Sequence, residues 1–374
     1  MKLEDLKSKI KASLRSQGFR IRGDKVLPHK DLKKSDIRSL NALAVQHRLD
    51  HSRPGLERHE DRLLSRLAFG NSVDPNAVSP FLVVVEPDSE YELLFRYAAL
   101  HWSIPVSSGY GRRLRFLVLD GQNDKLIGII GLGDPVFALG ARDEWIGWTP
   151  KQRAGRLRHV MDAFVLGAVP PYRELLCGKL VAMLTTSDEV RTEFHRKYRR
   201  KTSLIQAAEA DARLALITTT SALGRSSVYN RVRFEDRLLF RSVGYTRGSG
   251  EFHFSNGLYG ALHDFATEHC QPTAKKEEWG KGFRNRREVI KKCLQELELP
   301  NQWLYHGVQR EIFIVPLATN TREFLAGEHE RVRWYHQSVE DLAKSFISRW
   351  LLPKASRDSR YREFVPEQFR LWPK

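Results

Sequence analysis

The chain has 374 residues, 41% of them apolar, which is enough to bury a substantial core in one elaborated domain or in two. Lys and Arg outnumber Asp and Glu by 62 to 45, and the formal charge of +17 favours a polyanionic partner such as nucleic acid over an acidic protein subunit. The longest apolar stretch, residues 126–141, is interrupted by Asp134 and is too short to span a membrane. With no signal peptide and three widely spaced Cys, the sequence predicts a cytoplasmic protein without membrane contact.

The N-terminal region, residues 1–78, is predicted to be a basic helical arm. Its first 38 residues hold twelve Lys or Arg against five Asp or Glu, a composition suited to lying along phosphates or to forming a solvated helix face. Apolar spacing predicts helices over Leu3–Leu14, Ser35–His47 and Arg53–Phe69, the first of them ended by Gly18.

The central region, residues 79–266, alternates strand and helix patterns. Turn residues 121–124 join two β-rich runs into a hairpin, and the later elements follow in order. The predicted elements are strands Arg113–Leu119, Lys125–Leu132, Asp143–Trp148 and Val160–Val169, a helix with an apolar stripe over Leu175–Leu184, a basic helix over Glu189–Lys201, and a strand over Leu214–Thr219. This order is typical of the α/β fold of GNAT acyltransferases.

The C-terminal region, residues 267–374, is predicted to be a basic, helix-rich appendage that packs back on the core. Residues Trp279–Lys292 interleave cations with aromatic rings, Ile312–Leu317 reads as a strand, and Val339–Trp350 reads as an amphipathic helix. The predicted fold class is therefore α+β, with a GNAT-like mixed sheet at its centre.

Two neighbouring segments have the composition of a functional site. Residues 218–231 read TTTSALGRSSVYNR, and residues 243–253 read VGYTRGSGEFH. Small and hydroxyl side chains crowd around Gly224, and Arg, Tyr and Asn side chains follow. Packing alone rarely needs this composition, so we expect a polar ligand to approach these segments closely.

Several longer motifs accompany these segments. They are GYGRRLRFLVLD at 109–120, LIGIIGLGDPVF at 126–137, RDEWIGW at 142–148 and FVLGAVPPYRELLCGKLVAML at 164–184. Together they closely resemble the DruA family of the Druantia anti-phage systems, over roughly residues 80–265. The resemblance implies an antiviral role beside other defence proteins, including a large helicase-like subunit, and it assigns no reaction and no catalytic residues.

Arginines within and near these motifs are candidates for contacting nucleic acid, because guanidinium groups bind phosphate oxygens through paired hydrogen bonds. The residues predicted to bind are Arg112, Arg113, Lys179, Arg199, Arg200, Arg225, Tyr229, Asn230, Arg231 and Arg247. No reading helix or zinc module is evident, which indicates nonspecific contact with DNA.

Two enzymatic alternatives stay open. A metal-dependent nuclease needs converging carboxylates, and Asp134 and Asp143 are the candidates, with Mg²⁺ as the cofactor. Asp143 follows Arg142, so a structural ion pair is the competing interpretation of that residue.

The second alternative is an acyl-CoA-dependent acyltransferase. Arg173 and Gly178 match the ends of the pyrophosphate-binding turn of such folds, and Tyr229 lies about where they place a catalytic acid. The first glycine of that turn is replaced by Leu176, which argues against a working cofactor site, so we expect no cofactor. The favoured function is phosphate-directed DNA binding within an antiviral complex.

Overall fold

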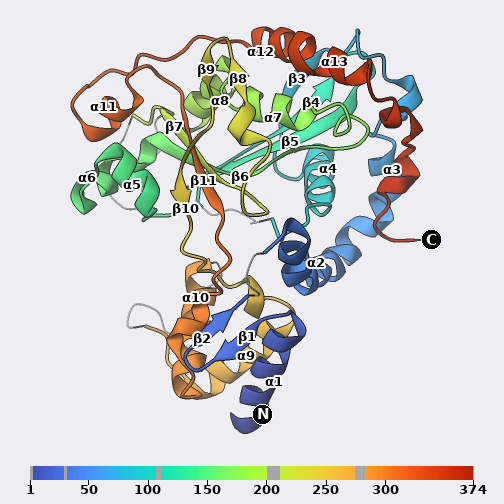
Figure 1. Ribbon diagram of the computed structural model, residues 1–374. Coiled ribbons are helices and arrows are strands. Elements are labelled where there is room, and N and C mark those ends of the chain that lie inside the picture. Colours follow the sequence, from blue (N-terminus) through green and yellow to red (C-terminus); the bar gives the residue numbers. More distant parts are fainter. Residues whose placement is uncertain are drawn as a thin grey trace.

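The computed structural model describes residues 3–28, 32–106, 111–199, 211–273, 279 and 283–373. The fold is mixed α and β, arranged as two lobes that are visible one above the other in Figure 1. We call the described residues within 34–245 and 311–373 the large lobe, which holds the main sheet. The described residues within 3–28 and 246–308 form the small lobe.

The large lobe is built on a seven-stranded sheet with the order β10-β11-β7-β6-β5-β4-β3. Its strands are β3 (Pro80–Val84), β4 (Arg113–Asp120), β5 (Lys125–Gly133), β6 (Val160–Ala168), β7 (Leu216–Thr220), β10 (Arg241–Tyr245) and β11 (Glu311–Pro316). Among the described strand pairs of this sheet, β6–β7 alone is parallel. This pairing ends at Ala163 and Thr219, after which β6 continues beside β5 alone.

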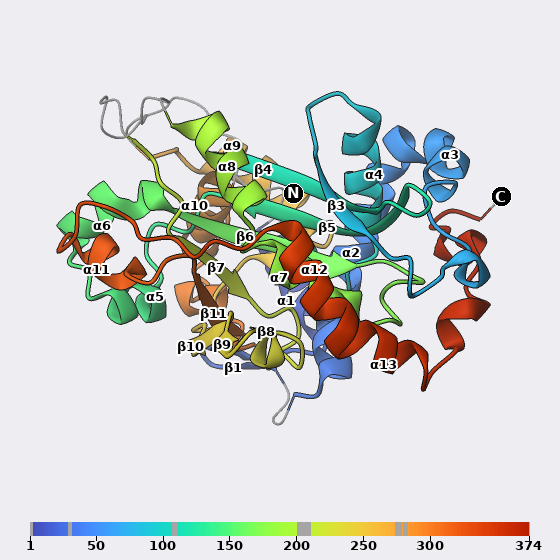
Figure 2. The same ribbon diagram turned by 90° about the horizontal axis from the view of Figure 1, so that it is seen from above.

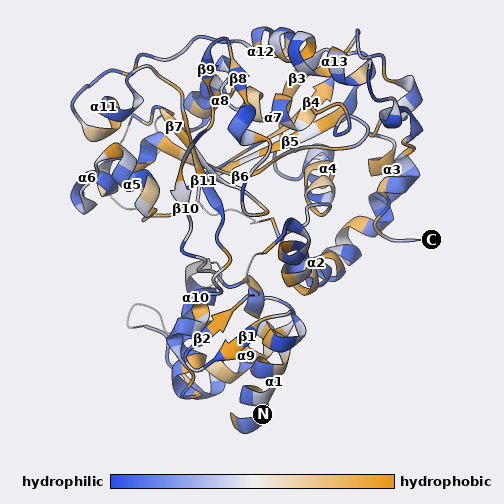
Figure 3. Ribbon diagram, in the orientation of Figure 1, coloured by the Kyte–Doolittle hydropathy of each residue, from blue (hydrophilic) through white to orange (hydrophobic). Residues whose placement is uncertain are grey.

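Helices cover both faces of the sheet. Their bounds are α2 (Lys34–Leu56), α3 (Glu60–Leu64), α4 (Glu90–Ala99), α5 (Gly140–Ile146), α6 (Pro150–Arg156), α7 (Cys177–Leu184), α8 (Asp188–Tyr198), α11 (Thr321–Ala326), α12 (Val339–Phe346) and α13 (Leu352–Ala355). Helices α7, α8 and α12 bury one face of the sheet, and α3 and α4 bury the other. From above, α12 and α13 lie across the strands (Figure 2). Apolar residues follow the strands, whereas the outer helix faces are polar (Figure 3).

The β4–β5 hairpin shows how the predicted turn is held. The Asp120 carboxylate accepts hydrogen bonds from the Ser79 and Gln122 backbone N–H groups at 2.9 and 3.2 Å and from the Tyr172 hydroxyl at 2.7 Å. This confirms the predicted hairpin and gives Asp120 a structural role, because a buried carboxylate needs such donors.

The small lobe joins the N-terminal segment and part of residues 246–308 around one core. It contains α1 (Leu3–Ser16), β1 (Arg20–Arg22), β2 (Lys25–Leu27), α9 (Leu258–His269) and α10 (Phe283–Glu296). Leu6, Ile10 and Leu14 are buried there against residues of α9 and α10, as the helical spacing predicts. This core therefore combines residues from more than one of the predicted regions 1–78, 79–266 and 267–374. The domain boundaries drawn between these regions stay a prediction.

Three predicted elements differ in the structure. Asp143–Trp148, predicted as a strand, belongs largely to helix α5, which ends at Gly147 in the left-handed conformation (φ 87°). The segment is too short for its apolar period to distinguish helix from strand. The predicted third helix is divided, because α2 runs on to Leu56 before α3 begins. Strand β11 lies between β7 and β10, so the C-terminal region completes the main sheet.

A short hairpin of β8 (Arg233–Phe234) and β9 (Arg237–Leu238) follows the loop after β7. Within the described residues, no helix is long and apolar enough to cross a membrane.

Four buried histidines predict how stability responds to acid. Burial lowers the pKa of His101 and His159 to about 3, of His253 to about 4 and of His306 to about 2. These groups stay neutral in the fold but take up protons in the unfolded chain below its pKa near 6.5, so their stabilising contribution is present above that pH and lost as the pH falls. Below pH 6.5, each of these histidines lowers the unfolding free energy by about 1.4 kcal/mol for every unit by which the pH falls.

We therefore expect chemical denaturation to show a steep fall in unfolding free energy between pH 6.5 and 5. His101 stacks on Phe369 with ring centroids 3.4 Å apart, so His101→Phe removes one titrating group while keeping an aromatic ring. The variant should have a shallower pH dependence. An unchanged slope would contradict the assignment.

Candidate nucleic-acid interface

The loop from Ser221 to Arg231 follows β7 and is held by the carboxylate of Glu311, at the start of β11. Glu311 is only 4% exposed. Its Oε2 accepts hydrogen bonds from the Ser226 backbone N–H at 2.9 Å and from the Asn230 side-chain amide at 3.3 Å. The Glu311 backbone N–H donates to the Gly224 carbonyl at 3.1 Å. One residue thus fixes three points of the loop.

The hydroxyl side chains of this loop serve its own backbone. Ser226 Oγ accepts from the N–H groups of Val228 and Tyr229 at 3.2 and 3.0 Å. Ser221 Oγ donates to the Gly224 carbonyl, and Gly224 has a φ of 71°, which a side chain would strain. The crowding of small residues that the sequence shows therefore builds the loop, and these groups are not free for a ligand.

Tyr229 and Asn230, both predicted to bind nucleic acid, face inward. The Tyr229 ring stacks on Phe240 with centroids 4.9 Å apart and meets the edge of Phe313 at 5.3 Å. Burial raises the pKa of Tyr229 to about 12, so the hydroxyl keeps its proton at neutral pH. Asn230 donates to the Ser226 carbonyl at 2.7 Å as well as to Glu311.

Arg225 and Arg231, which belong to this loop, are exposed. Within the described part of the chain, neither guanidinium has a hydrogen bond or an ion pair. Next to Arg225, the loop touches helix α2, where Lys34 Nζ lies 3.5 Å from Ser227 Oγ. Arg231 lies close enough to Lys179 for its charge to lower the pKa of Lys179, after the larger effect of burial. Within the described residues, the loop therefore carries one unpaired cation near its middle and one at its C-terminal end.

The remaining predicted cations are dispersed. Arg247, beyond β10, and Arg199, at the end of α8, are both exposed. Arg113 is exposed on β4, and its backbone pairs with the Tyr198 hydroxyl. Arg200 lies outside the described residues.

Arg112 is committed within the protein. Its Nε lies 2.6 Å from Asp134 Oδ1, and its two Nη atoms donate to the carbonyls of Arg158 and Val160 at 2.6 and 3.0 Å. Every nitrogen of this guanidinium has an acceptor, so we leave Arg112 out of the interface. The ion pair with Arg112 also occupies Asp134, which is one of the two carboxylates that a metal-dependent nuclease would need.

Asp143, the other carboxylate of that alternative, lies between two arginines. Arg142 Nη2 is 2.6 Å from Asp143 Oδ1, and Arg153 Nη1 is 2.9 Å from Oδ2. Arg142 is fully buried and also donates to the carbonyls of Val136 and Phe137. The structural ion pair weighed for Asp143 is therefore present. Among the residues that the structure describes, no group of three His, Cys, Asp or Glu side chains gathers where it can hold a metal ion.

The turn from Arg173 to Gly178, the candidate for binding the pyrophosphate of a cofactor, differs from a typical phosphate-binding loop. Arg173 is paired with Glu174 at 3.0 Å, and Leu176 occupies the left-handed conformation (φ 64°) directly before α7. A Cβ added at Gly178 meets nothing within 4 Å, so this glycine is not needed for close packing inside the protein.

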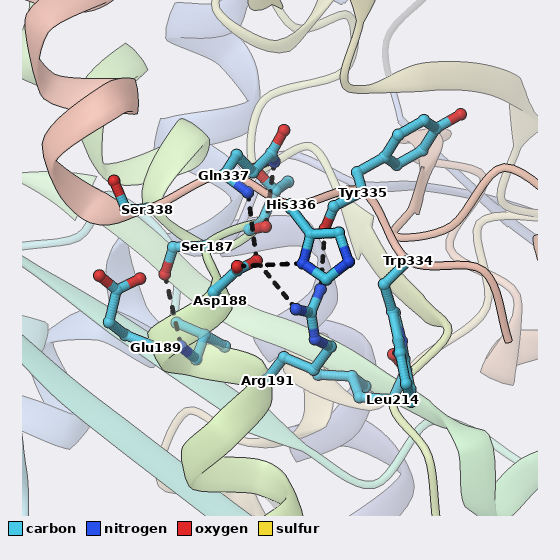
Figure 4. A network of polar contacts seen from close by, with 12 residues as sticks. Ser187, Asp188, Glu189, Arg191, Leu214, Trp334, Tyr335, His336, Gln337 and Ser338 are labelled. Atoms are coloured by element: carbon cyan, nitrogen blue, oxygen red, sulfur yellow. Dashed lines mark hydrogen bonds and ion pairs between the residues drawn. The ribbon is translucent and has the colours of Figure 1, made fainter.

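Helix α8 is fastened to the segment before α12 by a polar network (Figure 4). The Asp188 carboxylate accepts from Arg191 at 2.9 Å and from the Gln337 backbone at 3.2 Å, and it lies 3.5 Å from His336 Nδ1. Arg191 also donates to the Tyr335 carbonyl and covers the Trp334 ring. These groups satisfy one another, which indicates a structural role.

Sequence reasoning missed Glu311, Arg349 and Trp350. Glu311 is one acidic residue at the start of an apolar strand, and its partners lie more than 80 positions earlier, so no local pattern marks it. Arg349 and Trp350 fall inside what reads as an ordinary amphipathic helix.

The structural interpretation of Asp143 predicts a stability effect. Asp143→Asn leaves Arg142 buried without its counter-charge, which should lower the unfolding free energy by about 3 kcal/mol. Denaturant titration measures this loss, with the exposed neighbour Glu144→Gln as the control. A stable Asp143→Asn protein that loses biological activity would instead favour a catalytic carboxylate.

Comparison with known proteins identifies the family. The family model described as "Druantia protein DruA" matches residues 31–327. A Druantia protein DruA from Escherichia coli (strain UMEA 4076-1) is 39% identical over 358 residues, covering 96% of this chain and 89% of that protein. No solved structure is significantly similar. Because the match spans nearly the whole chain and includes the loop held by Glu311, we conclude that this chain belongs to the DruA family.

Proposed function

We propose that this protein is a component of an antiviral defence system and binds DNA, largely irrespective of sequence, through contacts to phosphate. The carrying observation is that the loop held by Glu311 displays Arg225 and Arg231 without a neutralising carboxylate among the described residues. Family membership supports the defence role. Such a protein would act with other defence proteins, including a helicase-like subunit.

The sorting of the arginines supports this proposal. Arg112, Arg142 and Arg153 bind carboxylates and carbonyls inside the protein, whereas Arg225 and Arg231 face solvent from a fixed backbone. Because the loop backbone is already fixed, only side-chain freedom is lost when a phosphate arrives. Phosphate contacts position a protein on DNA but carry no sequence information directly.

We infer that the main sheet is of the GNAT type. In support, β3 to β6 follow one another antiparallel, β6–β7 is the parallel pair, and β11 returns between β7 and β10. The Arg173–Glu174 pair and Leu176 in the cofactor turn favour a sheet that serves as a scaffold for binding over one that uses an acyl-CoA. The nuclease alternative loses support because Asp134 and Asp143 are bound by arginines.

The proposal predicts the effect of removing both loop arginines. Arg225→Ala combined with Arg231→Ala should weaken DNA binding by at least about tenfold. The slope of log K against log salt should become shallower by about 1.8, since each lost phosphate contact removes about 0.9. Phage protection should fall while the melting temperature stays nearly unchanged, because both side chains are exposed.

The matched control is Arg53→Ala with Arg360→Ala, which removes the same charge from exposed arginines that pair with Glu57 and Asp358. Fluorescence anisotropy at several salt concentrations measures both variants. Equal losses in the two would show that net charge, and not this loop, determines binding.

A further inference from the structure

Three cations from separate elements converge beside the interface. Lys179 lies in α7, Arg231 ends the 3₁₀ turn Tyr229–Arg231, and Arg349 lies in the π-helical turn Ile347–Leu351 between α12 and α13. We call these three residues the cation cluster. Arg231 belongs to the loop held by Glu311, so the cluster continues that surface onto the helices above the sheet.

Trp350 gathers two members of the cluster. The Lys179 ammonium lies 5.1 Å from the Trp350 ring centroid, and the Arg349 guanidinium carbon lies 4.9 Å from it. Cations are attracted to an aromatic face at such distances. One ring therefore contacts two positive groups that come from different helical segments.

The π turn explains how Arg349 and Trp350 reach this position. A π turn adds a residue to a helical turn and rotates the side chains that follow, and such turns occur frequently at functional sites. Here the apolar side of α12 packs on the core through Leu342 and Phe346, and the π turn comes immediately after.

The cluster lacks a counter-charge. Within the described residues, none of its three side chains has an ion pair or a hydrogen bond to a carboxylate. Burial lowers the pKa of Lys179, and the charges of Arg231 and Arg349 lower it further. Three uncompensated cations near one another cost electrostatic energy that a bound anion would recover.

We propose that the cation cluster binds a terminal phosphate of a DNA strand. This rests on the proposed DNA binding and specifies which part of the DNA this site takes. A backbone phosphodiester carries one negative charge, whereas a phosphate monoester carries about −1.5 to −2 near pH 7. Lys179 and Arg349 at one ring, with Arg231 close enough to influence Lys179, suit the more highly charged monoester, and the exposed Arg225 remains available for the backbone.

The direct test compares DNA duplexes of one sequence with a 5′-phosphate, a 3′-phosphate or no terminal phosphate. The wild-type protein should bind at least one phosphorylated form about tenfold more tightly than the unphosphorylated form. Lys179→Gln and Arg349→Gln should each remove most of that preference. Arg349→Gln, whose residue lies outside the predicted binding set, should also leave binding to unphosphorylated duplex within about twofold. Lys344→Gln, which removes an exposed lysine paired with Glu340 on α12, is the control and should keep the preference.

Acid provides a second readout, because the monoester loses its second charge with a pKa near 6. The preference for phosphorylated ends should shrink between pH 7.5 and 5.5. A preference that is absent in the wild type, or equally strong in all three Gln variants, would overturn the terminal-phosphate site. Tight binding to unphosphorylated duplex in that case would leave the proposed DNA binding intact.

Free nucleotides and coenzyme A also carry phosphate monoesters, so the test includes them as competitors of phosphorylated DNA. We expect millimolar concentrations of adenosine 5′-monophosphate or coenzyme A to compete weakly. Displacement of phosphorylated DNA by micromolar coenzyme A, lost in Lys179→Gln, would overturn the proposal in favour of a small-molecule cofactor site.

Discussion

The candidate interface depends on the hydrogen bonds accepted by the buried carboxylate of Glu311. Through Ser226 and Asn230 it fixes a loop that has no regular secondary structure over most of its length. Charge-assisted hydrogen bonds of this kind are stronger than neutral ones and are costly to break when buried. Glu311 forms no ion pair with Arg225 or Arg231, so neither guanidinium is paired with a carboxylate among the described residues.

The strongly basic composition therefore has two physical roles in this molecule. One set of arginines, of which Arg112 and Arg142 are the clearest, crosslinks segments by binding carboxylates and backbone carbonyls. Another set has no ion pair or hydrogen bond from its guanidinium groups among the described residues, and it includes Arg225, Arg231 and Arg349. Net charge alone does not distinguish these sets, since both contribute equally to it.

Sequence reasoning succeeded where the relevant contacts are local. Leu6, Ile10 and Leu14 repeat at helical spacing, and α1 buries them, while turn residues between two apolar runs gave the β4–β5 hairpin. It failed for Asp143–Trp148, because the apolar residues of so short a segment fit the period of a helix as well as that of a strand. The choice of a helix depends on the burial of Arg142, which the segment alone does not reveal. For the candidate site, residue type predicted Arg225 and Arg231, which the structure shows as exposed, but the inward roles of Asn230 and Tyr229 depend on partners distant in sequence.

The most direct test of the central claim compares DNA affinity of Glu311→Ala and Glu311→Gln, with melting temperatures measured in parallel. Both changes remove a negative charge near the arginines, which by charge alone would strengthen binding. Glutamine keeps an acceptor oxygen for the Ser226 N–H, whereas alanine leaves that N–H without this acceptor and leaves the Asn230 amide with the Ser226 carbonyl alone. Preorganisation by Glu311 predicts that folded Glu311→Ala binds DNA at least about fivefold more weakly than Glu311→Gln. Equal or tighter binding by folded Glu311→Ala would contradict it.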